Sequence, residues 1–194
     1  GRNCVHNMER DDMLFGDQTI YWIFNDKGNI HTESGGQPIG LEFHAQAFAF
    51  ATNDELNNMT FYSYKIINRS TYRLKDTYFS QWTDCDLGYA FDDYVGCDVK
   101  RGLGYCYNGK PVDGTGKDEH YGENPPAVGV DFFQGPYMDP DGLDNPIILS
   151  DGKDEMAVRS VNGVNFGDGE VDNERFGMRR FVYYNNTSVG PQGE

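Results

Sequence analysis

Five aspartates fall within the sixteen residues TDCDLGYAFDDYVGCD, at positions 83–98, and no lysine or arginine lies among them. Carboxylates this crowded repel one another unless they stay solvated, take up protons or share a cation. Short carboxylates in glycine-containing loops are oxygen ligands of the kind that calcium binds. The stretch therefore predicts a calcium site with ligands from Asp84, Asp86, Asp92, Asp93 and Asp98. The alternative is that these aspartates cap turns and face water.

The spacing of these aspartates does not match the EF-hand calcium loop. A loop that began at Asp84 would need glycine at its sixth position and glutamate at its twelfth, but Tyr89 and Val95 stand there. We therefore expect irregular ligation, in which Gly88 permits a bend that brings the later aspartates back towards the earlier ones. Backbone carbonyls would supply the remaining oxygens.

Two further acidic segments follow. The segment YMDPDGLDNP, residues 137–146, offers Asp139, Asp141 and Asp144 as metal ligands, but a turn of the Asp-Pro-Asp-Gly type explains it equally well. The segment NFGDGEVDNERFG, residues 165–177, holds four closely spaced acids. Arginines follow at once, which favours ion pairing over metal binding there.

The cysteines and histidines do not predict a zinc site. No two of the four cysteines have the C-x-x-C spacing, and the four histidines are scattered. Three cysteines lie in the most acidic stretch, and we predict that two of them form a disulfide, as in a protein of an oxidising compartment: Cys85, Cys97 and Cys106. Buried free thiols are the alternative.

Catalytic patterns are weak. The chain contains no G-x-S-x-G, H-E-x-x-H or P-loop motif. A glycoside hydrolase needs two carboxylates that face each other across a cleft, and Glu42 and Asp131 are the acids most embedded in predicted strands. Nothing in the sequence places these two near each other. We predict no catalytic and no cofactor-binding residues beyond the calcium ligands, and a non-enzymatic role is favoured.

The net charge of the chain restricts the classes of partner that it can bind. The 194 residues carry a net charge of −15, of which residues 1–83 contribute −3 and residues 84–194 contribute −12. Such a field repels phosphate backbones and anionic headgroups, which argues against nucleic-acid and membrane-surface binding. No apolar run approaches the roughly 18 residues that span a membrane. Calcium, glycans and other surface proteins remain as partners.

Apolar and polar residues alternate along much of the chain with a period of two, which indicates strands. One short helical turn is expected at 53–58, and long loops are expected at 84–126 and 134–145. The predicted strands span residues 19–25, 40–52, 59–68, 76–83, 127–133, 146–150, 156–161 and 179–185.

Many short strands with glycine-rich connections predict an all-β fold, an antiparallel β-sandwich with long loops rich in aspartate and glycine. We expect one sandwich domain over residues 19–186. Residues 1–18 are expected to form a linker or edge segment, and residues 187–194 a linker or tail.

Three long and unusual runs carry a resemblance to known proteins: MTFYSYKIINRSTYRLKDTYFSQWTDCDLGYAFDDYVGCDVKRGLGYCYNG, PPAVGVDFFQGPYMDPDG and FGDGEVDNERFGMRRFVYYNN. They resemble a region of large secreted proteins of the kind exported by the type IX secretion system, and the similarity extends from about Tyr21 to Asn186. The resemblance implies an extracellular or cell-surface setting, where calcium is plentiful. It supplies no catalytic residues.

These observations predict a calcium-stabilised β-sandwich region of a secreted cell-surface protein that acts in adhesion or as a scaffold. The alternative from a different class is a secreted carbohydrate-active enzyme or its carbohydrate-binding accessory module. A cleft with Glu42 and Asp131 about 5 to 10 Å apart would favour the enzyme.

Overall fold

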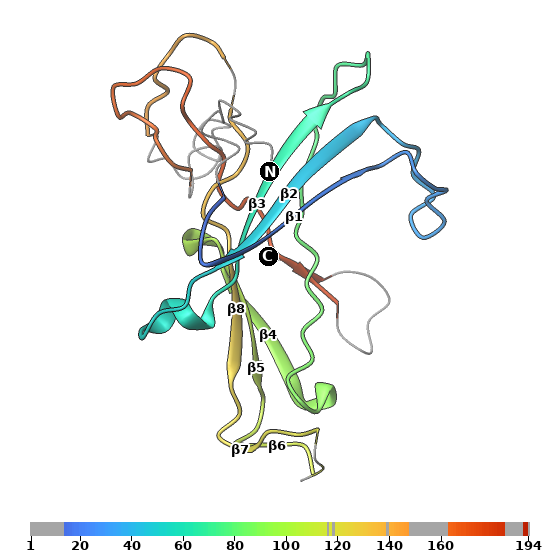
Figure 1. The fold of residues 1–194 in the computed structure, drawn as a ribbon, viewed down its shortest axis with the longest axis vertical. Coiled ribbons are helices and arrows are strands. Elements are labelled where there is room, and N and C mark those ends of the chain that lie inside the picture. The colour runs from blue at the N-terminus through green and yellow to red at the C-terminus, as the bar shows by residue number, and fades with distance from the viewer. Residues whose placement is uncertain are drawn as a thin grey trace, which may run out of the picture. The chain divides into compact units, whose positions relative to one another are not determined.

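The computed structural model describes residues 14–115, 117, 119–138, 140–147, 163–184 and 192–193. The regular structure in these residues consists of strands in antiparallel sheets and a few single-turn 3₁₀ helices (Figure 1). The all-β prediction is therefore confirmed. The chain divides into two compact units, Gly1–Ser80 and Gln81–Glu194. The predicted domain boundaries at 18/19 and 186/187 stay a prediction.

The first unit contains one three-stranded antiparallel sheet. Its strands are β1 (Gln18–Asn25), β2 (Leu41–Ala49) and β3 (Phe61–Asn68), in the order β1-β2-β3. Between β2 and β3 lies the 3₁₀ helix η2 (Glu55–Asn58), which Asp54 caps by accepting a hydrogen bond from the amide of Leu56. The predicted strands 19–25, 40–52 and 59–68 and the predicted turn at 53–58 are confirmed.

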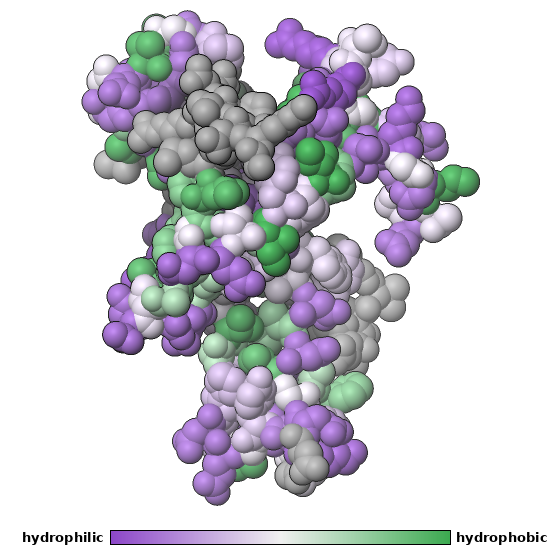
Figure 2. All heavy atoms as spheres, in the orientation of Figure 1, coloured by the Kyte–Doolittle hydropathy of each residue, from purple (hydrophilic) through white to green (hydrophobic). Residues whose placement is uncertain are grey.

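One face of this sheet is almost entirely apolar. The pairing register places side chains from all three strands on it: Ile20, Trp22, Phe24, Phe43, Ala45, Ala47, Tyr62, Tyr64 and Ile66. Several remain exposed, including Ile20 at 59% and Tyr62 at 59%, and apolar residues reach the surface in the space-filling view (Figure 2). A sheet face of this composition is typical of the inner layer of a packed structure.

The second unit is organised around another three-stranded antiparallel sheet. Its strands are β4 (Asp93–Asp98), β5 (Leu103–Asn108) and β8 (Ala127–Asp131), in the order β4-β5-β8. Two shorter antiparallel pairs accompany it: β6 (Val112–Asp113) with β7 (Gly122–Glu123), and β9 (Val182–Tyr183) with β10 (Gln192–Gly193).

The two faces of the sheet β4-β5-β8 differ in composition. Cys106 is buried on the inner face, and a side chain at Gly104 would collide with the ring of Phe181, which packs there. The outer face carries the rings of Tyr94, Tyr105 and Tyr107. The centroid of the Tyr107 ring lies 6.1 Å from that of Tyr94 and 6.0 Å from that of Tyr105. We call this group the tyrosine face.

Several predicted elements of the second unit need correction. The predicted loop 84–126 is wrong, because it contains β4 and β5. Asp93 and Asp98 are turn-type residues at the two ends of β4, and the strand between them is formed by its pairing with β5. The predicted strand 76–83 is also wrong, because these residues form no ladder with any described strand and their aromatic side chains are exposed.

The remaining predictions are met in part. The predicted strand 127–133 is confirmed as β8, and the prediction at 179–185 is reduced to the two residues of β9. Residues 146–147 are not in a strand, and residues 148–150 and 156–161 lie outside the described residues. No helix within the described part of the chain is long and apolar enough to cross a bilayer.

Candidate functional site

The loop that leads into β4 gathers three of the predicted calcium ligands. The 3₁₀ helix η3 (Ala90–Asp92) turns the chain so that Asp92 is buried while Asp93 begins the strand. The amide of Leu87 donates to Asp93 Oδ2 at 2.9 Å, which closes the loop. Burial is the main cause that raises the pKa of Asp93, and the carboxylates of Asp92 and Asp86 raise it further. The structure therefore brings Asp86, Asp92 and Asp93 together.

A fourth carboxylate, Asp113 of β6, joins this group and is fully buried. Its two oxygens accept hydrogen bonds from the amides of Tyr89, at 3.0 Å, and Tyr121, at 2.6 Å. Burial would raise the pKa of Asp113, but these amide hydrogen bonds outweigh burial and lower it. The side chain of Asp92 lies near Asp113 and is the smallest of the causes that lower the pKa of Asp113.

Three oxygens at the start of β4 are buried and have no hydrogen-bond partner within the described residues: Asp92 Oδ1, Asp93 Oδ1 and Asn108 Oδ1. Asp93 and Asn108 are directly paired across β4 and β5, so their side chains lie on the same face. The ammonium of Lys110 is 3.8 Å from Asp92 Oδ2, and the amide of Gly114 donates to the same oxygen. We call Asp92, Asp93, Asn108 and Asp113 the β4 oxygen cluster.

Two other predicted ligands are not members of this cluster. Asp84 is exposed, as Asp86 is, and its charge helps to raise the pKa of Cys85. Asp98 ends β4, five strand steps or roughly 17 Å from Asp93. Its side chain caps the 3₁₀ helix η4 (Val99–Arg101) by accepting from the amide of Arg101, so Asp98 is a turn residue.

The second predicted metal segment lies in a pair of loops, residues 140–147 and 163–176, that we call the loop pair. Asp139 lies outside the described residues. Asp141 accepts a hydrogen bond from the amide of Leu143, and Asp144 accepts from the amides of Gly167, at 2.8 Å, and Gly169, at 2.7 Å. Asp141 and Asp144 therefore anchor the backbone of these loops, as the turn interpretation predicts.

Sequence reasoning did not identify Asp113 and Asn108 as site residues. Asp113 stands in an Asp-Gly turn signal, which could have marked it, but its contact with the 86–93 loop depends on the hairpin of β6 and β7. Across the described chain, no three His, Cys, Asp or Glu side chains are arranged to hold a metal ion. A metal in the β4 oxygen cluster would therefore need amide and backbone oxygens as well, which calcium accepts.

The thiols of Cys85 and Cys106 lie beside the same cluster and in hydrogen-bond contact with each other. Both are free thiols, and Cys106 is buried. Burial raises the pKa of Cys106 to about 11, and the carboxylate of Asp93 adds to the shift. The disulfide among Cys85, Cys97 and Cys106 stays a prediction.

The acids proposed for a glycosidase lie in different units. Glu42 on β2 accepts hydrogen bonds from Arg69, at 2.8 Å, and pairs with His44, whose other ring nitrogen meets the hydroxyl of Tyr21 at 2.8 Å. Arg69 and then His44 are the main causes that lower the pKa of Glu42. Glu42 is thus a paired strand acid, and Asp131 ends β8 in an exposed position.

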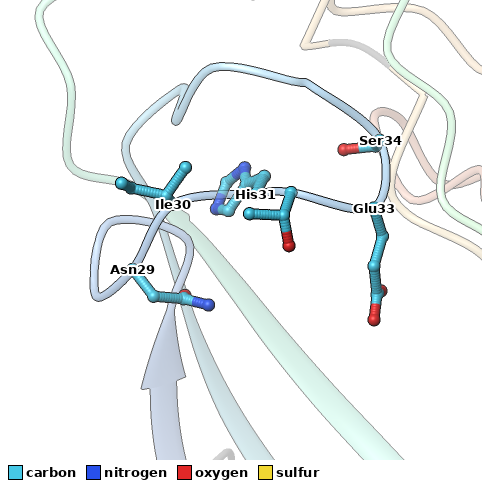
Figure 3. Close-up of a pocket in the computed structure, with 6 residues that line it drawn as sticks. Asn29, Ile30, His31, Glu33 and Ser34 are labelled. Carbon is cyan, nitrogen blue, oxygen red and sulfur yellow. The ribbon is translucent and has the colours of Figure 1, made fainter.

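A hollow in the loop between β1 and β2 offers little for a ligand. It is lined by the consecutive residues 29–34 alone. In Figure 3 the side chains of Asn29 and Glu33 lie at opposite ends of the curve and do not converge on one point. It is therefore the inner side of a single exposed loop.

No protein-family model, characterised protein or solved structure matches this chain.

Proposed function

We propose that the chain is a calcium-stabilised β-sandwich region of a secreted cell-surface protein, with a scaffold or adhesion role. The proposal depends on the β4 oxygen cluster, on the charge of −12 carried by residues 84–194, and on the resemblance to secreted proteins. The apolar face of the sheet β1-β2-β3 supports the sandwich, because a face of this kind needs a second layer to exclude water.

The observation that carries the proposal is the set of three buried, unpartnered oxygens on Asp92, Asp93 and Asn108. Buried carboxylate oxygens without a compensating partner are costly, so folding demands that something neutralise them. One proton can be shared by only two oxygens, whereas one metal cation can be coordinated by several oxygens at once. Every donor is a hard oxygen, which favours calcium over softer metals.

The test is a thermal melt in chelator, repeated after calcium and then magnesium are restored. A cation that binds only the folded form adds about 2.7 kcal/mol at a hundredfold excess over Kd. For a chain of this length we expect calcium to raise Tm by roughly 5 °C. Magnesium should do less, because it demands a tighter octahedral site. Metal analysis of the dialysed protein should find bound calcium.

Asp92→Asn should remove most of the calcium response. It should leave the melt in chelator nearly unchanged, because it deletes a repelling charge from the cluster together with the ion pair to Lys110, and the two effects oppose each other. Asp76→Asn is the matched control, since Asp76 is exposed, belongs to the first unit and has a positive φ that asparagine tolerates. Equal melting of the wild-type protein in chelator and in calcium, with no stoichiometric metal, would exclude the proposal.

A second candidate function is carbohydrate binding, and the tyrosine face favours it. The ring of Tyr105 lies over Gly96, where a side chain would come within 2.6 Å of the ring. The rings of Tyr94 and Tyr107 stand at 87° to each other, so the tyrosine face offers separate rings for stacking and not one flat surface. Tyr94, Tyr105 and Tyr107 are 59%, 39% and 41% exposed. Flat, exposed aromatic rings suit stacking against sugar rings.

For carbohydrate binding we expect Tyr105→Ala to weaken retention on an insoluble polysaccharide at least fivefold. The measurement is affinity electrophoresis or a pull-down against a panel of neutral glycans. Tyr72→Ala is the control, because Tyr72 is 73% exposed and does not belong to the tyrosine face. Retention that is absent in the wild-type protein, or equal in both variants, would argue against this function.

A further inference from the structure

The carboxylate of Glu174 is buried within the loop pair. Glu174 is 1% exposed, and its Oε1 accepts a hydrogen bond from the amide of Asn145. Its other oxygen, Oε2, has no hydrogen-bond partner in any described segment. A carboxylate in this position is stable only if a proton or a cation neutralises it.

Asn145, whose backbone amide donates to Glu174, has a side chain that also carries a buried oxygen without a partner among the described residues. Asn145 is 7% exposed, and this oxygen is its Oδ1. Next to Glu174 in the chain, the Oδ1 of Asn173 is a third such oxygen, while its Nδ2 donates to Asp168. The loop pair thus presents one carboxylate and two amide oxygens that lack donors.

The neighbouring arginine does not neutralise Glu174. The Arg175 guanidinium lies 3.8 Å above the ring of Tyr137 and donates to the carbonyl of Gly135. No ion pair to Glu174 is formed by the described residues. The ion pairing expected for residues 165–177 stays a prediction for Glu174.

The backbone around Glu174 is held in place independently of its side chain. Met138 donates its amide to the carbonyl of Glu174 at 2.9 Å, and Val164 exchanges two backbone hydrogen bonds with Arg175 at 3.1 Å. Phe166 is buried beneath these segments. The buried oxygens therefore sit in a formed site rather than in a loop that must first fold around a ligand.

We propose that Glu174 and Asn145 bind a calcium ion that ties residues 140–147 to residues 163–176, with Asn173 and backbone carbonyls as further oxygen donors. Calcium accepts a carboxylate together with amide and backbone oxygens. A proton on Glu174 would satisfy Oε2 and one acceptor, but it would leave the third oxygen unpaired. This inference rests on the proposed function in one respect: both require that the protein works in an environment that contains calcium.

The experiment compares wild-type protein with Glu174→Gln and Glu170→Gln. The two substitutions remove the same charge from the same segment, but Glu170 is exposed. We expect metal analysis to find two calcium ions in the wild-type protein and in Glu170→Gln, and one in Glu174→Gln and in Asp92→Asn. Calcium should also slow amide hydrogen exchange at least tenfold in wild-type peptides that cover 140–147 and 163–176.

The outcomes separate this site from the β4 oxygen cluster. Loss of one calcium in Glu174→Gln with none lost in Asp92→Asn would support the inference and count against the proposed function. The reverse pattern would overturn the inference alone. Unchanged exchange of the loop-pair peptides in wild-type protein would also overturn it, whatever the variants do. So would a Glu174→Gln protein that keeps its full calcium content, which is the result expected if Glu174 is protonated.

Discussion

Cys85 and Cys106 are placed to react with each other but are chemically restrained. Their thiols are in contact, whereas burial and the nearby carboxylates raise both pKa values, that of Cys106 to about 11. The thiolate is the reactive form, and while the pH is below the pKa its fraction rises about tenfold with each unit of increasing pH. Oxidation of this pair should therefore be slow at neutral pH and faster in alkali.

We predict that oxidised glutathione converts these two thiols to a Cys85–Cys106 disulfide and releases two molecules of reduced glutathione. The rate should rise roughly tenfold between pH 7 and pH 8, and the bond should stabilise the fold by about 3 kcal/mol. Mass spectrometry of the unreduced digest should recover the crosslinked peptide. The Cys97→Ala variant should form the same Cys85–Cys106 crosslink. A crosslink that instead contains Cys97, or full alkylation after oxidation, would contradict the prediction.

At the scale of elements, one side chain closes the long connection between β1 and β2. The carboxylate of Asp26 accepts hydrogen bonds from the amides of Ile39, Gly40 and Leu41, at 2.6, 3.1 and 3.0 Å. The carboxylate of Asp26 thus joins the two ends of the connection, and this contact sets the register of β1 and β2.

Asp26→Ala should lower the free energy of unfolding by roughly 1–3 kcal/mol, because it leaves three amides without their acceptor. Denaturant unfolding measures this loss, and hydrogen exchange should accelerate at residues 39–41. Glu33→Ala, an exposed change in the same connection, serves as the control and should alter stability by less than about 0.5 kcal/mol. Equal effects of the two substitutions would refute the role of Asp26.

The sequence predicted some of these elements and missed others for identifiable reasons. β1, β2 and β3 are eight or nine residues long, and their composition marks them as strands. In β2 the polar residues Glu42, His44 and Gln46 alternate with apolar ones, whereas β1 carries an unbroken apolar run from Ile20 to Phe24. β4 and β5 have six residues each and contain glycines, so turn chemistry masked their alternation. The run at 76–83 has strand composition but no partner strand in the described structure, and composition cannot reveal a missing partner.

For the whole molecule, acidity and oxygen-rich loops coincide. The first unit carries a net charge of −3 and the second −12, and the β4 oxygen cluster and the loop pair both belong to the second. Asp92 and Asp93 could be predicted as site residues because they are adjacent in a crowded stretch. Asp113, Asn108 and Glu174 could not, because their importance comes from burial and from contacts distant in the sequence.

The fit between Gly88 and Asp113 has a consequence for how this sequence can change over generations. Gly88 has a φ of +70°, and a side chain there would come within 2.0 Å of Asp113 Oδ2. Replacing Asp113 first would relieve the collision but leave the left-handed backbone, which asparagine tolerates. A side chain at position 88 should therefore cost less stability when position 113 has already lost its carboxylate than when Asp113 is present, so the order of the two substitutions matters.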